Sequence, residues 1–218
     1  MESRAKLKER VVLNCVLTVK SQLHIGAGKE AITPGTTDLV VIRDSNDMVY
    51  IPGSSIRGCL RMEAEKLSDE ETIEKIFGRA DKESLASKII VRNGYLKEEE
   101  VIGLDTRPGI QIDRETGSVK KGALFFTEAI PRGTKFYFQI IVDNPTDEEL
   151  QLILAAIRAV NDRGLGHGVS RGFGHVVIKI KDDSVIKTPT SYITGETESF
   201  IEKYKKLNLD DLIIKASD

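Results

Sequence analysis

A glycine cluster between a helix pattern and a strand pattern constrains the fold of this chain most strongly. Five glycines fall between Gly164 and Gly174, with Ser170 and Arg171 among them. Glycine loses more conformational freedom on folding than any other residue, so a cluster this dense needs a physical reason. Either the segment is a flexible turn after a helix, or its backbone approaches a ligand closely and offers N–H groups to phosphates, with Arg171 as a charged partner.

The composition is that of a globular protein and narrows the classes of function. A length of 218 residues fits one medium domain, and no apolar run approaches the ~20 residues of a membrane span. The charged N-terminus lacks the apolar core of a secretory signal, and Cys15 and Cys59 lie in apolar patterns typical of reduced core thiols. We therefore expect a cytoplasmic protein without a membrane partner. Because the net charge is −2, any nucleic-acid site must be a local basic surface, and basic residues gather in 53–61 and 163–171.

Alternating apolar residues predict strands, and apolar residues at helical spacing predict two helices. The expected strands are 11–20, 39–43, 48–51, 87–92, 135–142 and 176–180. One helix follows Pro52-Gly53-Ser54-Ser55, with a serine as its N-cap. The other follows a capping box of Thr146 and Glu149 and ends at Gly164.

This order of elements predicts an α+β fold, a ferredoxin-like (RRM-like) antiparallel sheet with two packing helices and a glycine-rich loop. Residues 1–182 would form this single domain. An insertion at about 100–134 is rich in turn residues and predicts a long hairpin that projects from the body. The polar residues 183–218 are expected to form a C-terminal appendage.

Several enzyme classes are disfavoured by what the motifs lack. The glycine loop has no Lys-Ser or Lys-Thr at its end, as a P-loop would require. No residues stand at zinc-ligand spacing. The three histidines, His24, His167 and His175, form no recognisable catalytic triad.

Two basic features leave alternatives open. Residues 171–178 nearly match the RNA-recognition-motif consensus, but His175 and Ile178 occupy positions where aromatic rings would stack on bases. Arg57 and Arg61 lie four residues apart beside a helix start. They fit either a phosphate seat or an ordinary solvated helix face.

Four segments in order resemble the RAMP superfamily, the ferredoxin-like subunits of CRISPR effector complexes. They are Leu23-His24-Ile25-Gly26, residues 51–58, residues 112–117 and the loop 164–174. The resemblance spans roughly residues 13–180, and the glycine loop together with the Pro-Gly-Ser-Ser helix start makes it specific. In particular, the chain resembles the repeating backbone subunit of type III complexes of the Csm/Cmr kind.

The resemblance implies an RNA-guided role. Copies of the subunit would stack into a helical filament along a CRISPR RNA, beside other type III effector subunits, and meet a complementary single-stranded target RNA. The insertion resembles the family's thumb, which wedges into the guide–target duplex. The helix start and the glycine loop would hold the RNA backbone, which makes these residues candidate RNA contacts: His24, Gly53, Ser54, Ser55, Arg57, Arg61, Gly166, Gly168, Ser170, Arg171, Gly172 and Phe173.

Asp38 matches the aspartate that cuts target RNA in catalytic members of the family, and it would also be the metal ligand. Mg²⁺ or another divalent metal fits a single carboxylate, because phosphates and waters can supply its other ligands. Where the family often has Gly-x-Ile-Asp, this chain has Gly35-Thr36-Thr37-Asp38. We therefore expect a metal-dependent endoribonuclease within a complex. The alternatives are a non-catalytic scaffold of that complex, a stand-alone RRM-like RNA binder, and a CRISPR RNA-processing enzyme in which His24 takes part.

Overall fold

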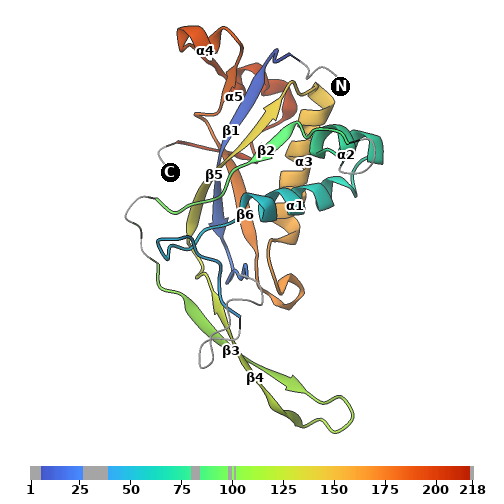
Figure 1. Cartoon of the computed structure of the whole chain (residues 1–218), viewed down its shortest axis with the longest axis vertical. Helices are drawn as coiled ribbons and strands as arrows, with labels where there is room; N and C mark the ends of the chain where they lie inside the picture. The colour runs from blue at the N-terminus through green and yellow to red at the C-terminus, as the bar shows by residue number, and fades with distance from the viewer. Residues whose placement is uncertain (1–5, 27–38, 80–83, 98–99, 101, 217–218) are drawn as a thin grey trace.

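The fold is built around one long, nearly fully buried strand. In the computed structural model, which describes residues 6–26, 39–79, 84–97, 100 and 102–216, the main sheet has seven strands in the order β2-β5-β1-β6-β9, with β7 and β8 attached beside β1 (Figure 1). Its strands are β1 (Arg10–Val19), β2 (Ile89–Val91), β5 (Lys135–Asp143), β6 (Val176–Lys181), β7 (Val185–Lys187), β8 (Glu198–Ser199) and β9 (Ile213–Ile214). All pairs are antiparallel except β6 with β9.

Alternation along β1 gives the sheet two different faces. Leu13, Cys15 and Leu17 are buried, and each is paired with a buried residue of β5. This face is covered by α1 (Gly53–Ala64) and α3 (Asp147–Arg163), with α2 (Glu70–Phe77) beside them (Figure 1). Asn14, between the inward residues, pairs with Gln139 on the opposite face. The mixed α+β architecture and the strands expected at 11–20, 135–142 and 176–180 are confirmed.

The helix termini confirm one sequence prediction and correct another. Thr146 and Glu149 form the complete capping box at the start of α3, and Gly164 ends that helix with φ 98°. At α1 the N-cap is Pro52, not a serine, and it makes no side-chain capping bond. The N–H of Gly53 instead donates to Oδ1 of Asn93 at 2.8 Å. The cap comes from a residue 40 positions away in the chain, which a local motif cannot reveal.

The insertion is a hairpin of β3 (Asp105–Ile112) and β4 (Val119–Ala129), which projects from the body as predicted (Figure 1). The two strands expected at 39–43 and 48–51 are not continuous strands. Their residues form only isolated bridges, such as Arg43 with Val49, around a turn in which the N–H of Asp47 donates to the carbonyl of Asp44. The expected strand at 87–92 shortens to β2, and α2 was not predicted.

The C-terminal residues differ from the separate appendage predicted for 183–218. β7 pairs with β1, and β9 pairs with β6 in parallel. The short helices α4 (Ser191–Thr194) and α5 (Phe200–Lys203) lie between them, and Phe200 is fully buried. Several apolar residues of this segment thus belong to the common core, although Tyr192 and Ile193 stay exposed, so residue 182 is no boundary. In the residues that the structure describes, no helix is long and apolar enough to cross a membrane.

Candidate nucleic-acid interface

The glycine loop is a compact structure held against the end of β1. Its middle forms a short 3₁₀ turn over Val169–Arg171, flanked by Gly168 and Gly172 in the left-handed region. The N–H of His167 donates to the carbonyl of His24 at 2.9 Å, and the N–H of Gly174 donates to the carbonyl of Gln22 at 2.8 Å. The flexible-turn interpretation of the cluster therefore does not describe this loop.

Three glycines are required for the chain to approach itself, and a Cβ on the first of them, Gly164, would lie 2.5 Å from the carbonyl oxygen of Gly174. A Cβ on Gly174 would lie 2.0 Å from the carbonyl oxygen of Leu165, and one on Gly166 would lie 2.5 Å from that of His24. Gly172, in contrast, has open space around its Cβ position. Close approach is thus the reason for glycine at 164, 166 and 174, but the partner is the protein's own backbone. The outer turn at 170–172 is exposed, but the N–H groups of Arg171 and Gly172 already donate to the carbonyls of Gly168 and Val169, so the turn offers a ligand mainly its side chains.

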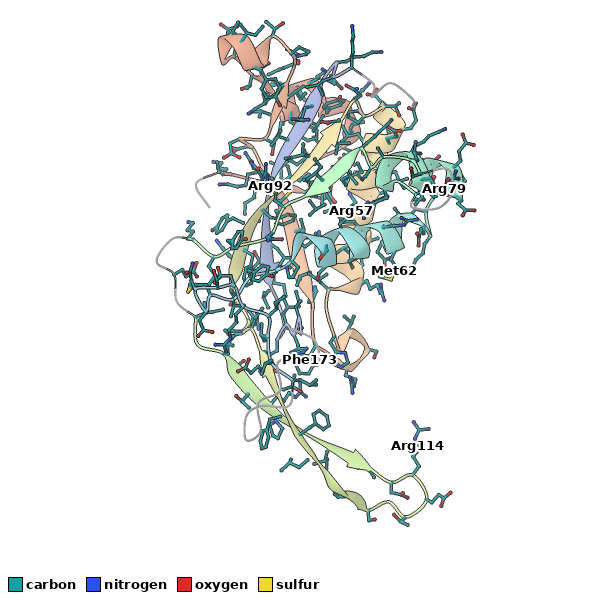
Figure 2. All side chains as sticks on the ribbon, viewed as in Figure 1. Arg57, Met62, Arg79, Arg92, Arg114 and Phe173 are labelled. Carbon is teal, nitrogen blue, oxygen red and sulfur yellow. The ribbon has the colours of Figure 1, made fainter. Side chains whose placement is uncertain are left out.

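A first hollow of about 230 Å³ lies between this loop, the end of β1 and the base of the hairpin. Its wall includes four predicted RNA contacts, and the prediction named none of the other eight lining residues. The predicted ones are His24, Gly168, Arg171 and Phe173, and the others include Arg107, Thr127 and His167. Figure 2 shows Phe173 where the hairpin meets the body, and Arg114 at the far tip of the hairpin.

Histidine and arginine side chains order the inside of this hollow. Nδ1 of the buried His24 donates to the carbonyl of Glu128, 2.8 Å away, and its ring lies 6.0 Å from that of His167. Nη2 of Arg171 donates to Nε2 of His167 at 2.9 Å. Because arginine has no acceptor, that bond leaves the His167 proton on Nδ1. The guanidinium of Arg171 therefore lies beside two oriented imidazoles.

Arg107 connects the hairpin to the glycine loop. Its guanidinium carbon lies 4.9 Å from the ring centroid of Phe173, within the range of a cation–π contact. Phe173 is half-buried, so this contact occupies part of the ring surface that a base could use. Arg107 could not be singled out from the sequence, because no local pattern in residues 105–112 indicates that it packs against Phe173.

A second hollow, of about 270 Å³, lies between α1 and the glycine loop. Ser55, Gly58 and Arg163 line it together with Gly164, Leu165 and Gly166. Sγ of Cys59 donates to the carbonyl of Gly164, and burial raises the pKa of the Cys59 thiol, which keeps it neutral. The first turns of α1 and the glycine loop therefore lie side by side, although Cys59 and Gly164 are 105 residues apart in the chain.

The remaining predicted contacts lie elsewhere on α1. Ser54 is exposed in the first turn, whereas Gly53 is buried against β2. Arg57 donates to the carbonyl of Phe77, and Arg61 donates to the carbonyl of Gly78 at 3.3 Å. Both arginines thus bind the C-terminal end of α2, and burial, with the nearby Arg61 charge, lowers the pKa of Arg57. The structure does not bring them to the glycine loop.

Asp38, the predicted catalytic and metal-binding residue, lies outside the described residues. The next residue, Leu39, is in the wall of the first hollow. Its N–H donates to the carbonyl of Phe126, and its carbonyl accepts from the N–H of Glu128. Both backbone groups of Leu39 are therefore bonded to β4. Among the described residues there is no group of three or more His, Cys, Asp or Glu side chains that could hold a metal ion.

Comparison with known proteins gives one family. The model of the RAMP superfamily matches residues 16–177. The CRISPR system Cms endoribonuclease Csm3 of Methanocaldococcus jannaschii is 30% identical over 94% of this chain and 92% of its own length. The protein of the same name from Streptococcus thermophilus is 26% identical, over 86% of this chain and 98% of its own length.

Solved structures share the fold. A chain of the Csm3-Csm4 subcomplex in the type III-A CRISPR-Cas interference complex has a TM-score of 0.59 and 24% identity, and the match covers 94% of this chain and 97% of that one. A chain of the type III-B Cmr-beta complex bound to cognate target RNA has a TM-score of 0.63 and 16% identity, covering 83% of this chain and 61% of that one. Together with the family match over most of its length, these findings show that the chain belongs to the RAMP superfamily.

Proposed function

We propose that this chain is the repeating backbone subunit of a type III CRISPR effector complex, which holds CRISPR RNA and cuts complementary single-stranded target RNA. One observation carries the proposal. The glycine loop, the end of β1 and the base of the projecting hairpin enclose a single hollow, and the residue after Asp38 is fixed in its wall. The loop that would bind phosphate therefore lines the same hollow as Leu39, the residue that follows the proposed cleaving group in the sequence.

The topology supports a ferredoxin-like assignment of the core. The elements β1, α1, β2, β5, α3 and β6 follow one another as βαββαβ, with α2 and the hairpin as additions. Their strands lie in the order β2-β5-β1-β6, which places the first and third of them at the centre. The two helices on one face leave the other face of the sheet uncovered by them (Figure 1).

The partners proposed for the chain are CRISPR RNA, target RNA, further copies of itself and other type III effector subunits. The names of its relatives and of the similar structures place those proteins in Csm and Cmr complexes. A chain with a net charge of −2 needs a local positive surface to hold RNA, and Arg171, Arg107 and Arg163 supply it around the two hollows. Such a complex would act in the cytoplasm.

In binding, each residue of the loop has a separate task. Arg171 is exposed and presents a planar guanidinium that matches phosphate geometry. Ser170 and Gly172 flank it on the outer turn, where no side chain of a neighbour fills the space beside Gly172. If these groups contact phosphates and not base edges, the loop would hold RNA of any sequence and leave recognition to guide–target pairing.

In cleavage, Asp38 would hold a divalent metal ion together with oxygens of the RNA phosphate. One carboxylate suffices for Mg²⁺, which keeps most of its waters and takes the other ligands from phosphates. When bound, the ion supplies a Lewis acid that polarises the scissile phosphate. The chain's own contribution would be the anchored Leu39, which follows Asp38 in the sequence and lines the same hollow as Arg171.

The test is Asp38→Ala in the assembled complex. We expect target RNA cleavage to fall by at least about a hundredfold, as for loss of a metal-holding group, while complex assembly and target binding stay intact. Removing divalent metal with EDTA should have the same effect on the unsubstituted complex. The measurement is the rate at which labelled complementary RNA is cut at regular intervals.

The matched control is Asp162→Ala, which removes an exposed carboxylate from the last turn of α3 and should leave the cleavage rate unchanged. Full cutting by Asp38→Ala would reject Asp38 as the catalytic residue. Complexes that hold RNA but never cut it, with Asp38 present, would instead identify a non-catalytic scaffold. A monomer that binds short RNA without partners, and loses affinity on Phe173→Ala, would identify a stand-alone binder.

A further inference from the structure

The sheet face opposite α1 and α3 carries a third hollow, larger than the other two at about 710 Å³. It lies across β1, β5 and the end of β6, and continues onto the segment that follows β2. Among its lining residues are Asn14, Arg92, Tyr95, Tyr137, Gln139 and Lys181. It has no lining residue in common with the two hollows beside the glycine loop, so it is a separate feature of the surface.

Aromatic rings form the floor of this hollow. Tyr137 points away from the helices because its neighbours in β5, Phe136 and Phe138, point into the core. Tyr95 pairs with Tyr137 through two backbone hydrogen bonds of 3.0 and 2.7 Å. The Tyr95 side chain is 46% exposed, and its ring stacks on that of Tyr50 with centroids 5.8 Å apart. These rings are fixed by the sheet and face outward, as base-stacking rings do in sheet-based RNA binders.

Positive charges surround the rings. Nζ of Lys97 lies 5.4 Å from the centroid of the Tyr137 ring, and Nζ of Lys181 lies 5.8 Å from the same centroid. Arg92, directly after β2, is exposed and lines the hollow (Figure 2). The acidic residue in the lining is Asp183, which Lys181 already contacts at 3.8 Å. The local charge is therefore positive on a chain that is acidic overall.

Polar amides complete the lining. Nε2 of Gln139 donates to Oδ1 of Asn14 at 2.9 Å, across the two central strands. Nδ2 of Asn93 donates to the hydroxyl of Tyr95 at 3.1 Å. Asn14 also donates to Asp183, and Asn93 also accepts from the N–H of Gly53, so these amides hold the lining in place.

From this combination we infer that the uncovered sheet face is a second binding site, which takes a short stretch of single-stranded nucleic acid. A base stacks on Tyr137 when Lys97 and Lys181 turn from its ring to the phosphates, and Tyr95 offers the ring face that Tyr50 does not cover, with Arg92 as a further phosphate partner. A protein partner would need an acidic surface to match these cations and an apolar one to use the rings. A strand of nucleic acid offers both chemistries in its repeating unit. The inference is independent of the function proposed for the glycine loop.

The experiment measures binding of a fluorescent eight-residue oligouridylate and of the matching oligothymidylate to the full chain carrying Arg171→Ala, which weakens the loop. On that background, Tyr137→Leu should raise the Kd for the oligonucleotide about tenfold, because one stacking ring is lost. Arg92→Ala should weaken binding. It should also reduce the slope of log Kd against log salt concentration by about one, because one phosphate contact is lost. Photo-crosslinks should map to the peptides that contain Tyr95 and Tyr137.

Tyr192→Leu is the matched control. Tyr192 is also an exposed tyrosine with a lysine, Lys187, 5.9 Å from its ring centroid, but it lies outside the hollow. Its loss should leave the Kd unchanged. A preference for one oligonucleotide would identify the strand as RNA or DNA, and equal affinity would indicate that the site uses only the rings and phosphates that both share.

An unchanged Kd in Tyr137→Leu, or crosslinks confined to the glycine loop, would overturn the second site. So would binding of an acidic peptide, but no oligonucleotide, at this face. If Tyr137→Leu does not fold, Tyr95→Leu tests the same ring platform at a more exposed position. Every variant in this experiment already carries Arg171→Ala, so a negative result concerns the sheet face alone. It leaves the Asp38→Ala test of the proposed function unaffected.

Discussion

At the scale of single residues, the glycines of the loop differ in what they provide. Gly166 and Gly174 let two backbone segments touch, and Gly164 ends α3. Gly172 has a positive φ of 87°, but no atom of another residue lies near its Cβ position. The same residue type therefore serves internal packing at some positions and an open outer turn at another.

Gly174→Ala should be far more destabilising than Gly172→Ala. Both positions have a positive φ, 72° and 87°, so both substitutions incur about 1 kcal/mol of backbone strain. Only at 174 would the new Cβ also meet a carbonyl oxygen at 2.0 Å, which should add at least about 2 kcal/mol. Urea unfolding of the two variants measures the difference, and equal losses would show that the loop does not pack on itself as described.

The arginines at 57 and 61 make the same point about local patterns. Four residues apart on one helix, they form a basic pair that resembles a phosphate seat. In the tertiary structure their donors point to the carbonyls at the end of α2, which the sequence did not indicate as a helix. That these arginines also contact RNA stays a prediction. It can be tested by measuring the RNA affinity of Arg57→Lys.

At the scale of elements, a buried carboxylate connects α1 to α3. Glu63 is 5% exposed and accepts from Nζ of Lys66 at 2.8 Å and from Nη1 of Arg163 at 3.1 Å. Burial opposes ionisation, but the two cations outweigh it and hold the pKa of Glu63 below its ordinary value. The pair fixes the last turn of α3 beside α1, and so the start of the glycine loop beside the helix.

Glu63→Gln should reduce stability at neutral pH but not in acid. A carboxylate with a lowered pKa stabilises the folded state above its unfolded pKa, and that contribution is lost as pH falls through the folded value. Because Lys66 and Arg163 are about half exposed, we expect only about 1 kcal/mol at pH 7. Urea unfolding of both proteins from pH 7 to below 4.5 should show the difference shrinking, and a constant difference would contradict the ion-pair role.

At the scale of the whole molecule, the C-terminal segment completes the core. Phe200, Tyr204, Leu207, Leu209 and Leu212 are all buried, although the segment around them is polar. β7 extends the pairing of β1 beyond β6, and β9 lies beside β6. The body that presents the glycine loop thus depends on residues far beyond it in the chain.

Phe200→Ala should cost about 3–5 kcal/mol, because it removes a large, fully buried side chain. Ile193→Ala, in the same segment, should change stability by less than about 0.5 kcal/mol, because Ile193 is 87% exposed. Thermal unfolding of the two variants tests this directly. Equal small effects would restore the interpretation of residues 183–218 as a separate appendage.

The sequence by itself determined the elements whose signals are local. Alternation determined β1, β5 and β6, the capping box determined the start of α3, and Gly164 determined its end. Four ordered segments also determined the family, because the order of motifs along the chain can be recognised without knowing which residues are in contact. These features depend on residues that lie within a few positions of one another.

Tertiary structure alone decided which side chains share a site. It placed Arg107 on Phe173, Asn93 at the start of α1, and the tail in the core. It also placed the outward aromatic ring on β5, at Tyr137, and not on the consensus-like segment 171–178, where Ile178 is buried. Each of these contacts joins residues tens of positions apart, and their energies come from packing and charge across the fold, which no local pattern records.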